Sequence, residues 1–234
     1  TQIVRNVSFP VKPGSTFGIV GTTGSGKTSL VSLMTRFYEP TEGTVLLDGR
    51  DVQKYKLAYL RQSISVAMQE AFLFSDSVSG NIAYGCPDLL QERVEACAHT
   101  ADADGFIKEL SDGYDTLVGE RGVGLSGGQK QRISLARALA MQPSVLVLDD
   151  TTSAVDMETE QNIQNRLRHL DFPCTKIIVA QRISSVQDAD EIIVMDKGRL
   201  IERGTHSQLL KEHGLYYRIW VLQNRMKAGE QIGA

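Results

Sequence analysis

The chain has 234 residues, 41% of them hydrophobic, which is enough to bury the core of one large domain or of a core with an inserted subdomain. The 25 basic and 28 acidic residues give a formal net charge of −3 and are scattered, so no basic face for nucleic acid is expected. No apolar stretch approaches the roughly 20 residues of a membrane span, and no signal segment opens the chain. We therefore expect a chain that by itself neither crosses a bilayer nor is exported.

The cysteines are Cys86, Cys97 and Cys174, which are odd in number and far apart. This usage favours a reduced, cytosolic setting, and the paired spacing of a zinc site is missing.

The first part of the chain alternates strand, loop and helix signals. Its predicted elements in chain order are a strand over 3–9, a turn over 11–14, a buried strand over 17–20, a helix over 26–38, and strands over 44–49 and 64–69. From about 77 to 112 the pattern changes to short helical segments, of which 88–100 is the clearest, and this indicates an inserted helical region.

Three apolar runs rich in Val and Ile follow, over 144–150, 175–181 and 191–196, separated by helical patterns. This alternation predicts an α/β fold with a mostly parallel sheet covered on both faces. Thr205 and Gln208 have capping-box spacing and predict a closing helix over 205–213.

The strongest motif is "GTTGSGKT" at 21–28, a full match to G-x-x-x-x-G-K-[ST] between a predicted strand and a predicted helix. Glycines let successive backbone N–H groups point at phosphate oxygens, and the following helix adds its positive end. Lys27 is expected to reach the β- and γ-phosphates, and the Thr28 hydroxyl to ligate Mg²⁺. A glycine-rich turn with an unrelated lysine is the competing interpretation. The predicted nucleotide-binding residues are Gly21, Thr22, Thr23, Gly24, Ser25, Gly26, Lys27, Thr28 and Ser29.

Two adjacent acids end the strand "SVLVL". Asp149 is expected to hold Mg²⁺ through water, and the metal would lower the cost of placing two carboxylates side by side. Asp150 would then lie toward the γ-phosphate, where hydrolysis needs a base to orient water.

A second motif, "LSGGQ", is formed by Leu125, Ser126, Gly127, Gly128 and Gln129. The spacing of Ser126 and Gln129 is that of an ordinary capping box, and a helix start with two glycines is also a second anion site. The chain thus has two predicted phosphate-binding elements, one over 21–28 and one over 125–129. This suggests that the two do not bind the same nucleotide in the same subunit.

With these motifs, the sequence resembles the nucleotide-binding domain of ABC transporters over almost its whole length. "GTTGSGKT" looks like Walker A, "VLVLD" (145–149) like Walker B, "LSGGQ" like the signature and "SAVD" (153–156) like the D-loop. Gln69 matches the Q-loop, and "TLVGERG" (116–122) matches the X-loop typical of exporters.

The resemblance implies a P-loop NTPase (RecA-like) fold with an antiparallel β subdomain and an inserted α-helical subdomain. We expect one nucleotide-binding domain over 1–234, with a core over about 1–70 and 142–234 and a helical subdomain over about 71–141.

The resemblance also implies a head-to-tail dimer with two ATP molecules between the subunits. Ser126, Gly127 and Gly128 would grip the γ-phosphate held by the partner, and Asp156 would reach across the interface. Gln69 would link Mg²⁺ to the surface that touches the transmembrane domain of the same half-transporter.

Two positions depart from the family pattern, and both belong to the expected catalytic site. Asp150 stands where the family has Glu, and Gln181 stands where it has the switch histidine. An Asp carboxylate is withdrawn by about 1.5 Å relative to Glu, and misplacing a catalytic group by about 1 Å can cost on the order of 100-fold in rate. Gln181 carries no proton to exchange and no charge.

We therefore expect a site that binds ATP and hydrolyses it slowly, in one half of a heterodimeric exporter whose non-identical partner supplies Glu and His. Asp150 acting as base through a bridging water is the alternative.

The family usually stacks adenine on an aromatic residue before the first strand, and no Tyr precedes Phe9. The chain is thus expected to begin after that residue, as a part of a longer half-transporter at the cytoplasmic face of the plasma membrane. Multidrug or lipid-like export is expected from the family alone.

Three competing functions remain: a soluble ABC ATPase of DNA repair or translation, a regulatory module that binds ATP without hydrolysis, and an importer ATPase. "TLVGERG" and the charge balance count against the first, and "TLVGERG" also against the third.

Overall fold

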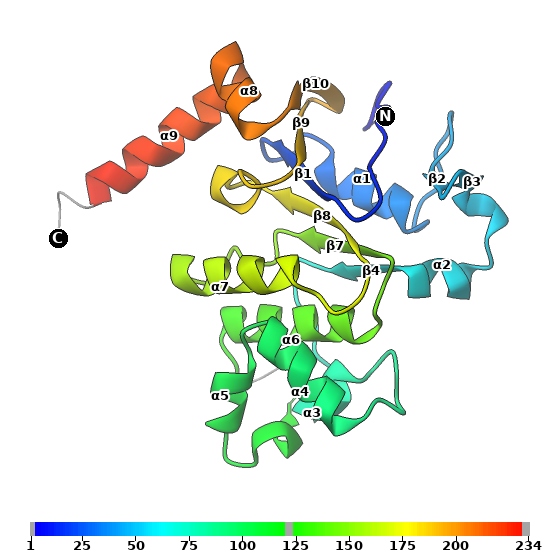
Figure 1. Cartoon of the computed structure of the whole chain (residues 1–234), viewed down its shortest axis with the longest axis vertical. Helices are drawn as coiled ribbons and strands as arrows, with labels where there is room; N and C mark the ends of the chain where they lie inside the picture. The colour runs from blue at the N-terminus through cyan, green and yellow to red at the C-terminus, as the bar shows by residue number, and fades with distance from the viewer. Residues whose placement is uncertain (1–2, 120–123, 231–234) are drawn as a thin grey trace. The chain divides into compact units, whose positions relative to one another are not determined.

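The computed structural model describes residues 3–119 and 124–230, with side chains described up to Arg225. The chain divides into two compact units, one formed by Thr1–Leu60 with Thr175–Ala234 and the other by Arg61–Cys174. Figure 1 follows the elements of both along the chain. In the described residues, none of the helices combines the length and apolar composition needed to cross a bilayer.

The first unit is built on a mostly parallel sheet. Strand β1 (Thr16–Gly21) lies between β8 (Thr175–Ala180) and β9 (Glu191–Asp196), parallel to both, and β10 (Arg199–Gly204) pairs antiparallel with β9. The parallel strands are buried along nearly their whole length, as their continuous apolar composition predicts. The predicted strands over 17–20, 175–181 and 191–196 are therefore confirmed.

Helix α1 (Lys27–Met34) follows β1 directly, as expected, but it ends before residue 38. The Thr35 hydroxyl donates to the Val31 carbonyl, and Arg36 adopts a left-handed backbone with φ 54°. A left-handed residue cannot continue a right-handed helix, so the chain turns away at this point.

The prediction of a strand over 3–9 is wrong, because the described residues 3–15 contain no strand. Asn6 has φ 51°, which breaks an extended backbone, and the Arg5 N–H donates to the Gly198 carbonyl in the turn after β9.

The strand expected over 44–49 is present as a short hairpin, β2 (Leu46–Leu47) with β3 (Arg50–Asp51). Asp48 and Gly49 form its turn, both with positive φ, which is the chemistry of a two-residue hairpin. A 3₁₀ turn over Val52–Lys54 and helix α2 (Leu57–Ser63) lead out of the hairpin.

The second unit pairs β4 (Ile64–Ala67) in parallel with β7 (Val145–Asp149). Helix α6 (Gly127–Ala140) contacts both strands, and α3 (Val78–Ile82) and α4 (Gln91–Thr100) pack against α6 (Figure 1, green). The remaining elements of this unit are α5 (Asp104–Lys108), a 3₁₀ turn over Gly113–Asp115, the short pair β5 (Asp76–Ser77) with β6 (Leu117–Val118), and α7 (Met157–Arg168). The helical region expected between 77 and 112 is present.

The chain closes with two helices. Helix α8 (His206–Glu212) begins with the predicted capping box, in which Thr205 and Gln208 exchange both hydrogen bonds. Helix α9 (Leu215–Glu230), which the sequence reading did not anticipate, follows it and extends away from α8 (Figure 1, orange to red).

Candidate functional site

The loop between β1 and α1 has the backbone of a phosphate cradle. Gly24 and Gly26 have φ values of 77° and 100°, which only glycine adopts without strain, and the space beside Gly24 is open. Thr22, Thr23 and Gly24 are exposed, so this loop is accessible from outside. Alternating left-handed and right-handed backbone turns successive N–H groups toward one point, where an anion binds.

Lys27 supplies the positive charge of this loop. Its side chain is buried, and Nζ donates to the carbonyl oxygens of Gly21 at 2.7 Å and Thr22 at 3.0 Å. The ammonium is thus held across the loop, positioned to attract an anion at the start of α1.

Ser25 connects the loop to the turn between β9 and β10. Its backbone carbonyl accepts a hydrogen bond of 3.0 Å from the N–H of Gly198, in the turn between β9 and β10. Its hydroxyl oxygen is buried and has no hydrogen-bond partner among the described residues. Sequence reasoning missed Gly198, although a Lys-Gly pair between two strand-like runs is a recognisable hairpin signal.

Gln181 leaves the sheet beside this loop. Val20, the last residue but one of β1, pairs with Ala180, the last residue of β8. Because neighbouring parallel strands end at the same edge, the phosphate loop and the exposed Gln181 emerge side by side.

The two acids end β7 in the other unit. Asp149 is buried at the strand terminus, and Asp150, half-buried, has a left-handed backbone with φ 50°. β4 ends at the same edge, since Ala67 pairs with Leu148, so the exposed Gln69 follows two residues later close to these acids.

The residues fit a nucleoside triphosphate with Mg²⁺. The loop over 21–28 combines turned backbone N–H groups, an ammonium and an unpartnered buried hydroxyl, which is a donor set for phosphate oxygens. Thr28, at the end of this loop, offers a hydroxyl oxygen, and Asp149, in the other unit, offers carboxylate oxygens; each is a ligand type that Mg²⁺ prefers. Ser29 follows within the first turn of α1.

The second motif forms the start of α6 with the expected capping box. Ser126 Oγ accepts from the Gln129 N–H at 3.2 Å, and Gln129 Oε1 accepts from the Ser126 N–H at 2.9 Å. Ser126 and Gly127 are exposed and Leu125 is half-buried. A Cβ at position 128 would lie only 2.8 Å from the Ala154 carbonyl oxygen, so glycine is required there by close packing.

Gln131, on α6, joins three of the predicted segments and was missed by sequence reasoning. Its Nε2 donates to the Gln69 carbonyl at 3.2 Å and to Ser153 Oγ at 3.1 Å, and its Oε1 accepts from the Ala154 N–H at 3.2 Å. The signal that could have found it is a polar residue on the buried stripe of a helix, where it must be hydrogen-bonded.

Asp156 serves as the N-cap of α7. Both carboxylate oxygens accept hydrogen bonds of 2.9 Å from Thr159, one from its N–H and one from its hydroxyl. These bonds lower the pKa of Asp156 because they favour the charged form. Its expected contact with a second subunit stays a prediction. Residues 120–123 of the predicted X-loop lie outside the described residues, which include Leu117 and Val118 of that motif, in β6.

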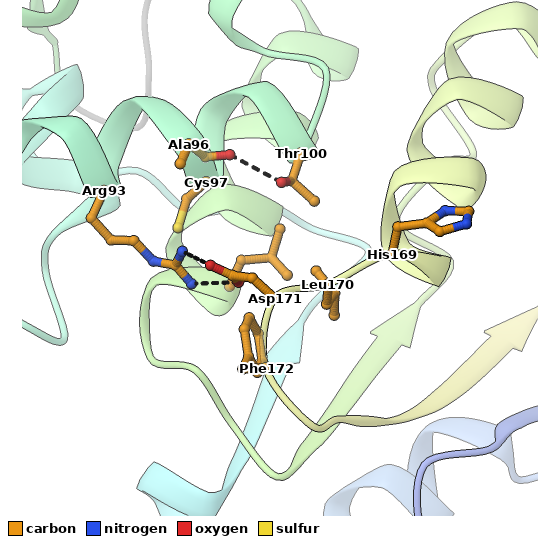
Figure 2. Close-up of a pocket in the computed structure, with 9 residues that line it drawn as sticks. Arg93, Ala96, Cys97, Thr100, His169, Leu170, Asp171 and Phe172 are labelled. Atoms are coloured by element: carbon orange, nitrogen blue, oxygen red, sulfur yellow. Dashed lines mark hydrogen bonds and ion pairs between the residues drawn. The ribbon is translucent and has the colours of Figure 1, made fainter.

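A separate pocket of about 120 Å³ lies between α4, α6 and the segment after α7 (Figure 2). An Arg93–Asp171 ion pair of 2.5 Å lines it, and burial raises the pKa of the neighbouring Cys97 thiol to about 11. None of the predicted site residues lines this pocket, and a thiol that stays protonated at neutral pH is a poor nucleophile.

Comparison with known proteins agrees with this geometry. The family model described as "ABC transporter" matches residues 4–153. The uncharacterized ABC transporter ATP-binding protein YknU of Bacillus subtilis (strain 168) is 52% identical over 225 residues, which are 96% of this chain and 38% of that protein. The ATP-dependent lipid A-core flippase of Chromohalobacter salexigens is 47% identical over 222 residues, again 38% of its length.

A solved structure of a bacterial Atm1-family ABC exporter with ATP bound superposes with a TM-score of 0.92 at 42% identity, over 94% of this chain and 39% of that one. This chain therefore spans well under half the length of the relatives it matches. Its P-loop NTPase fold, its motifs and these similarities show that the chain belongs to the ABC transporter family, as a nucleotide-binding domain of the exporter type.

Proposed function

We propose that this chain binds MgATP in the loop over 21–28 and hydrolyses it to power export, together with a transmembrane domain of the same half-transporter at the cytoplasmic face of the plasma membrane. The loop geometry supports ATP as the ligand, since Lys27 and the turned glycines form an anion cradle. The similarity to an exporter with ATP bound supports the coupling to export.

Hydrolysis at this site is slow in the proposal. The observation that carries it is the pairing of Val20 with Ala180, which brings Gln181 out of the sheet next to the phosphate loop. A neutral amide at that position can accept or donate a hydrogen bond to a phosphate, but it cannot exchange a proton or carry charge. Asp150 stands at the position where the family has Glu, and its side chain is one methylene shorter, which withdraws the carboxylate.

The start of α6 completes a second site on a non-identical partner in this proposal. Ser126 and Gly127 are exposed at a capped helix N-terminus, so they are accessible to a phosphate carried by another subunit. Gln131 supports this role because it ties α6 to the Gln69 segment and to the Ser153–Ala154 segment.

Restoring the family residues tests the slow site. Steady-state phosphate release is compared between the unmodified chain and the double variant Asp150→Glu with Gln181→His. We expect the double variant to be faster by about 10- to 100-fold, with little change in the KM for ATP, because catalytic geometry and not binding is altered. Equal rates in the two proteins would refute the slow site.

A further inference from the structure

The side chain of Gln223 connects the C-terminal helix α9 to the segment that carries Gln181. Its Oε1 accepts from the Ile183 N–H at 2.9 Å, and its Nε2 donates to the Gln181 carbonyl at 2.8 Å. Both partners lie in the same unit as α9; Ile183 precedes Gln223 by 40 residues and Gln181 precedes it by 42.

These two bonds hold one short stretch of backbone in one orientation. A carboxamide presents a donor and an acceptor side by side, as a neighbouring strand does, and it pairs here with the carbonyl and the N–H on either side of Arg182. The stretch begins where β8 ends at Ala180, so Gln223 pairs backbone groups just beyond the strand. The direction of the Gln181 side chain therefore depends on a residue of α9.

Other hydrogen bonds hold the N-terminus of α9, which we call its base. The Glu202 carboxylate accepts hydrogen bonds from the N–H groups of Leu215 and Tyr216, and the fully buried Tyr216 shares a 2.7 Å hydrogen bond with His206. Gln223 lies about 12 Å farther along the helix, at a rise of 1.5 Å per residue. A change in the angle of α9 about its base would therefore displace Gln223, and with it the backbone of Gln181.

We propose that Gln223 is a positioning residue for ATP hydrolysis, through which the placement of α9 sets the orientation of Gln181 at the phosphate loop. The inference rests on the proposed function, because it needs Gln181 to act on bound nucleotide. It gives Gln223 alone among the described side chains of α9 this role, acting through backbone hydrogen bonds and without contact to the nucleotide.

Three variants separate this role from simple support of the fold. Gln223→Leu keeps the approximate volume and removes both hydrogen bonds. Gln223→Glu keeps the acceptor for Ile183 but, when ionised, places a carboxylate against the Gln181 carbonyl. Asn224→Leu is the matched control, since Asn224 is the next residue on α9 and is exposed.

We expect the kcat of Gln223→Leu to fall on the order of 10-fold while its KM for ATP stays within about 2-fold, and Asn224→Leu to behave as the unmodified chain. The activity of Gln223→Glu relative to the unmodified chain is expected to rise as the pH falls from about 8 to 5, because a protonated carboxyl can again donate to the carbonyl. Equal kcat values for Gln223→Leu and Asn224→Leu would overturn the proposal.

Hydrogen exchange of the Ile183 amide provides a readout that does not depend on activity. Exchange at Ile183 is expected to quicken in Gln223→Leu and to stay unchanged in Asn224→Leu, while the melting temperature of both variants reports on the fold. Unchanged exchange at Ile183 in Gln223→Leu would overturn the claim that Gln223 holds this backbone. An unmodified chain that shows this protection but hydrolyses no ATP would refute the proposed function and leave the structural link established.

Discussion

At the scale of single residues, two glycines show how the same backbone conformation has different consequences. Gly49 and Gly198 each take the second position of a two-residue hairpin turn, with φ values of 76° and 77°. Among the described residues beyond its chain neighbours, none comes within 4 Å of a Cβ placed at Gly49, whereas a Cβ at Gly198 would collide with the Ile3 carbonyl oxygen. Gly198 also donates to Ser25 of the phosphate loop, so its surroundings matter for the site.

Replacing each glycine by alanine separates backbone strain from collision. Gly49→Ala should lower the free energy of unfolding by about 1 kcal/mol, the usual cost of a left-handed alanine. Gly198→Ala should cost about 1–3 kcal/mol more, because the segment at Ile3 must move, and it should weaken MgATP binding by loosening Ser25. Denaturant unfolding and titration with a fluorescent ATP analogue measure the two effects, and equal losses in both variants would contradict this account.

The backbone conformation at position 150 favours Asp over the longer Glu. A non-glycine residue with φ 50° is strained, and Asp tolerates the left-handed region better than most side chains, including Glu. The residue with the shorter side chain at the proposed catalytic position is thus also suited to the turn after β7. The stability of the Asp150→Glu variant should therefore be measured alongside its rate.

At the scale of elements, α7 depends on the charge of its N-cap residue, Asp156. The Asp156 carboxylate accepts two hydrogen bonds from Thr159, which hold its pKa below the ordinary value of Asp. A carboxyl with a lowered pKa in the folded state binds fewer protons there than in the unfolded chain. Its stabilising effect is therefore complete above the ordinary Asp pKa and disappears as the pH falls through the folded value.

The cap should be visible as a pH-dependent stability. On acidification below about pH 4, the melting temperature of the unmodified chain should fall more steeply than that of Asp156→Asn, whose side chain does not titrate. Glu158→Gln, which removes a charge from the same helical turn without touching the Thr159 hydrogen bonds, should follow the unmodified chain. Parallel acid profiles for the unmodified chain and Asp156→Asn would show that the cap does not contribute.

At the scale of the whole molecule, the two elements proposed to bind phosphate belong to different compact units of the chain. The phosphate loop lies in the unit that contains β1, and the start of α6 lies in Arg61–Cys174. In the proposed head-to-tail dimer each nucleotide would contact the loop of one chain and the α6 start of the other. Such a shared site can be rebuilt from two inactive chains.

Mixing two blocked variants tests this arrangement. Lys27→Ala removes the loop ammonium, and Ser126→Arg blocks the α6 start, each in a chain carrying Asp150→Glu and Gln181→His so that turnover is measurable. Each variant alone should be inactive, and an equal mixture should recover about a quarter of the unblocked rate, since half of randomly paired dimers have one intact site. A mixture that forms dimers but is no faster than its separate components would contradict shared sites.

Much of the fold could be predicted from the sequence because its signals are local. Continuous Val- and Ile-rich runs marked the buried parallel strands, and the capping boxes at Ser126 and Thr205 are formed by side chains three residues apart. The strand expected over 3–9 failed for a reason that propensity does not report, since Asn6 turns the backbone out of the extended region. Helix α9 was missed where no capping signal marks its start.

The sequence by itself determined the phosphate loop, the paired acids and the α6 start, because the residues of each motif are adjacent in the chain. It also determined that Asp150 and Gln181 depart from the Glu and His of the family pattern. Only the tertiary structure decided which distant residues support them: Gly198 behind Ser25, Gln131 between three segments, and Gln223 beside Gln181. The physical reason is that these supports are single hydrogen-bonding side chains or close backbone contacts. Their partners are brought near by the folding of the chain, and no spacing along the sequence encodes them.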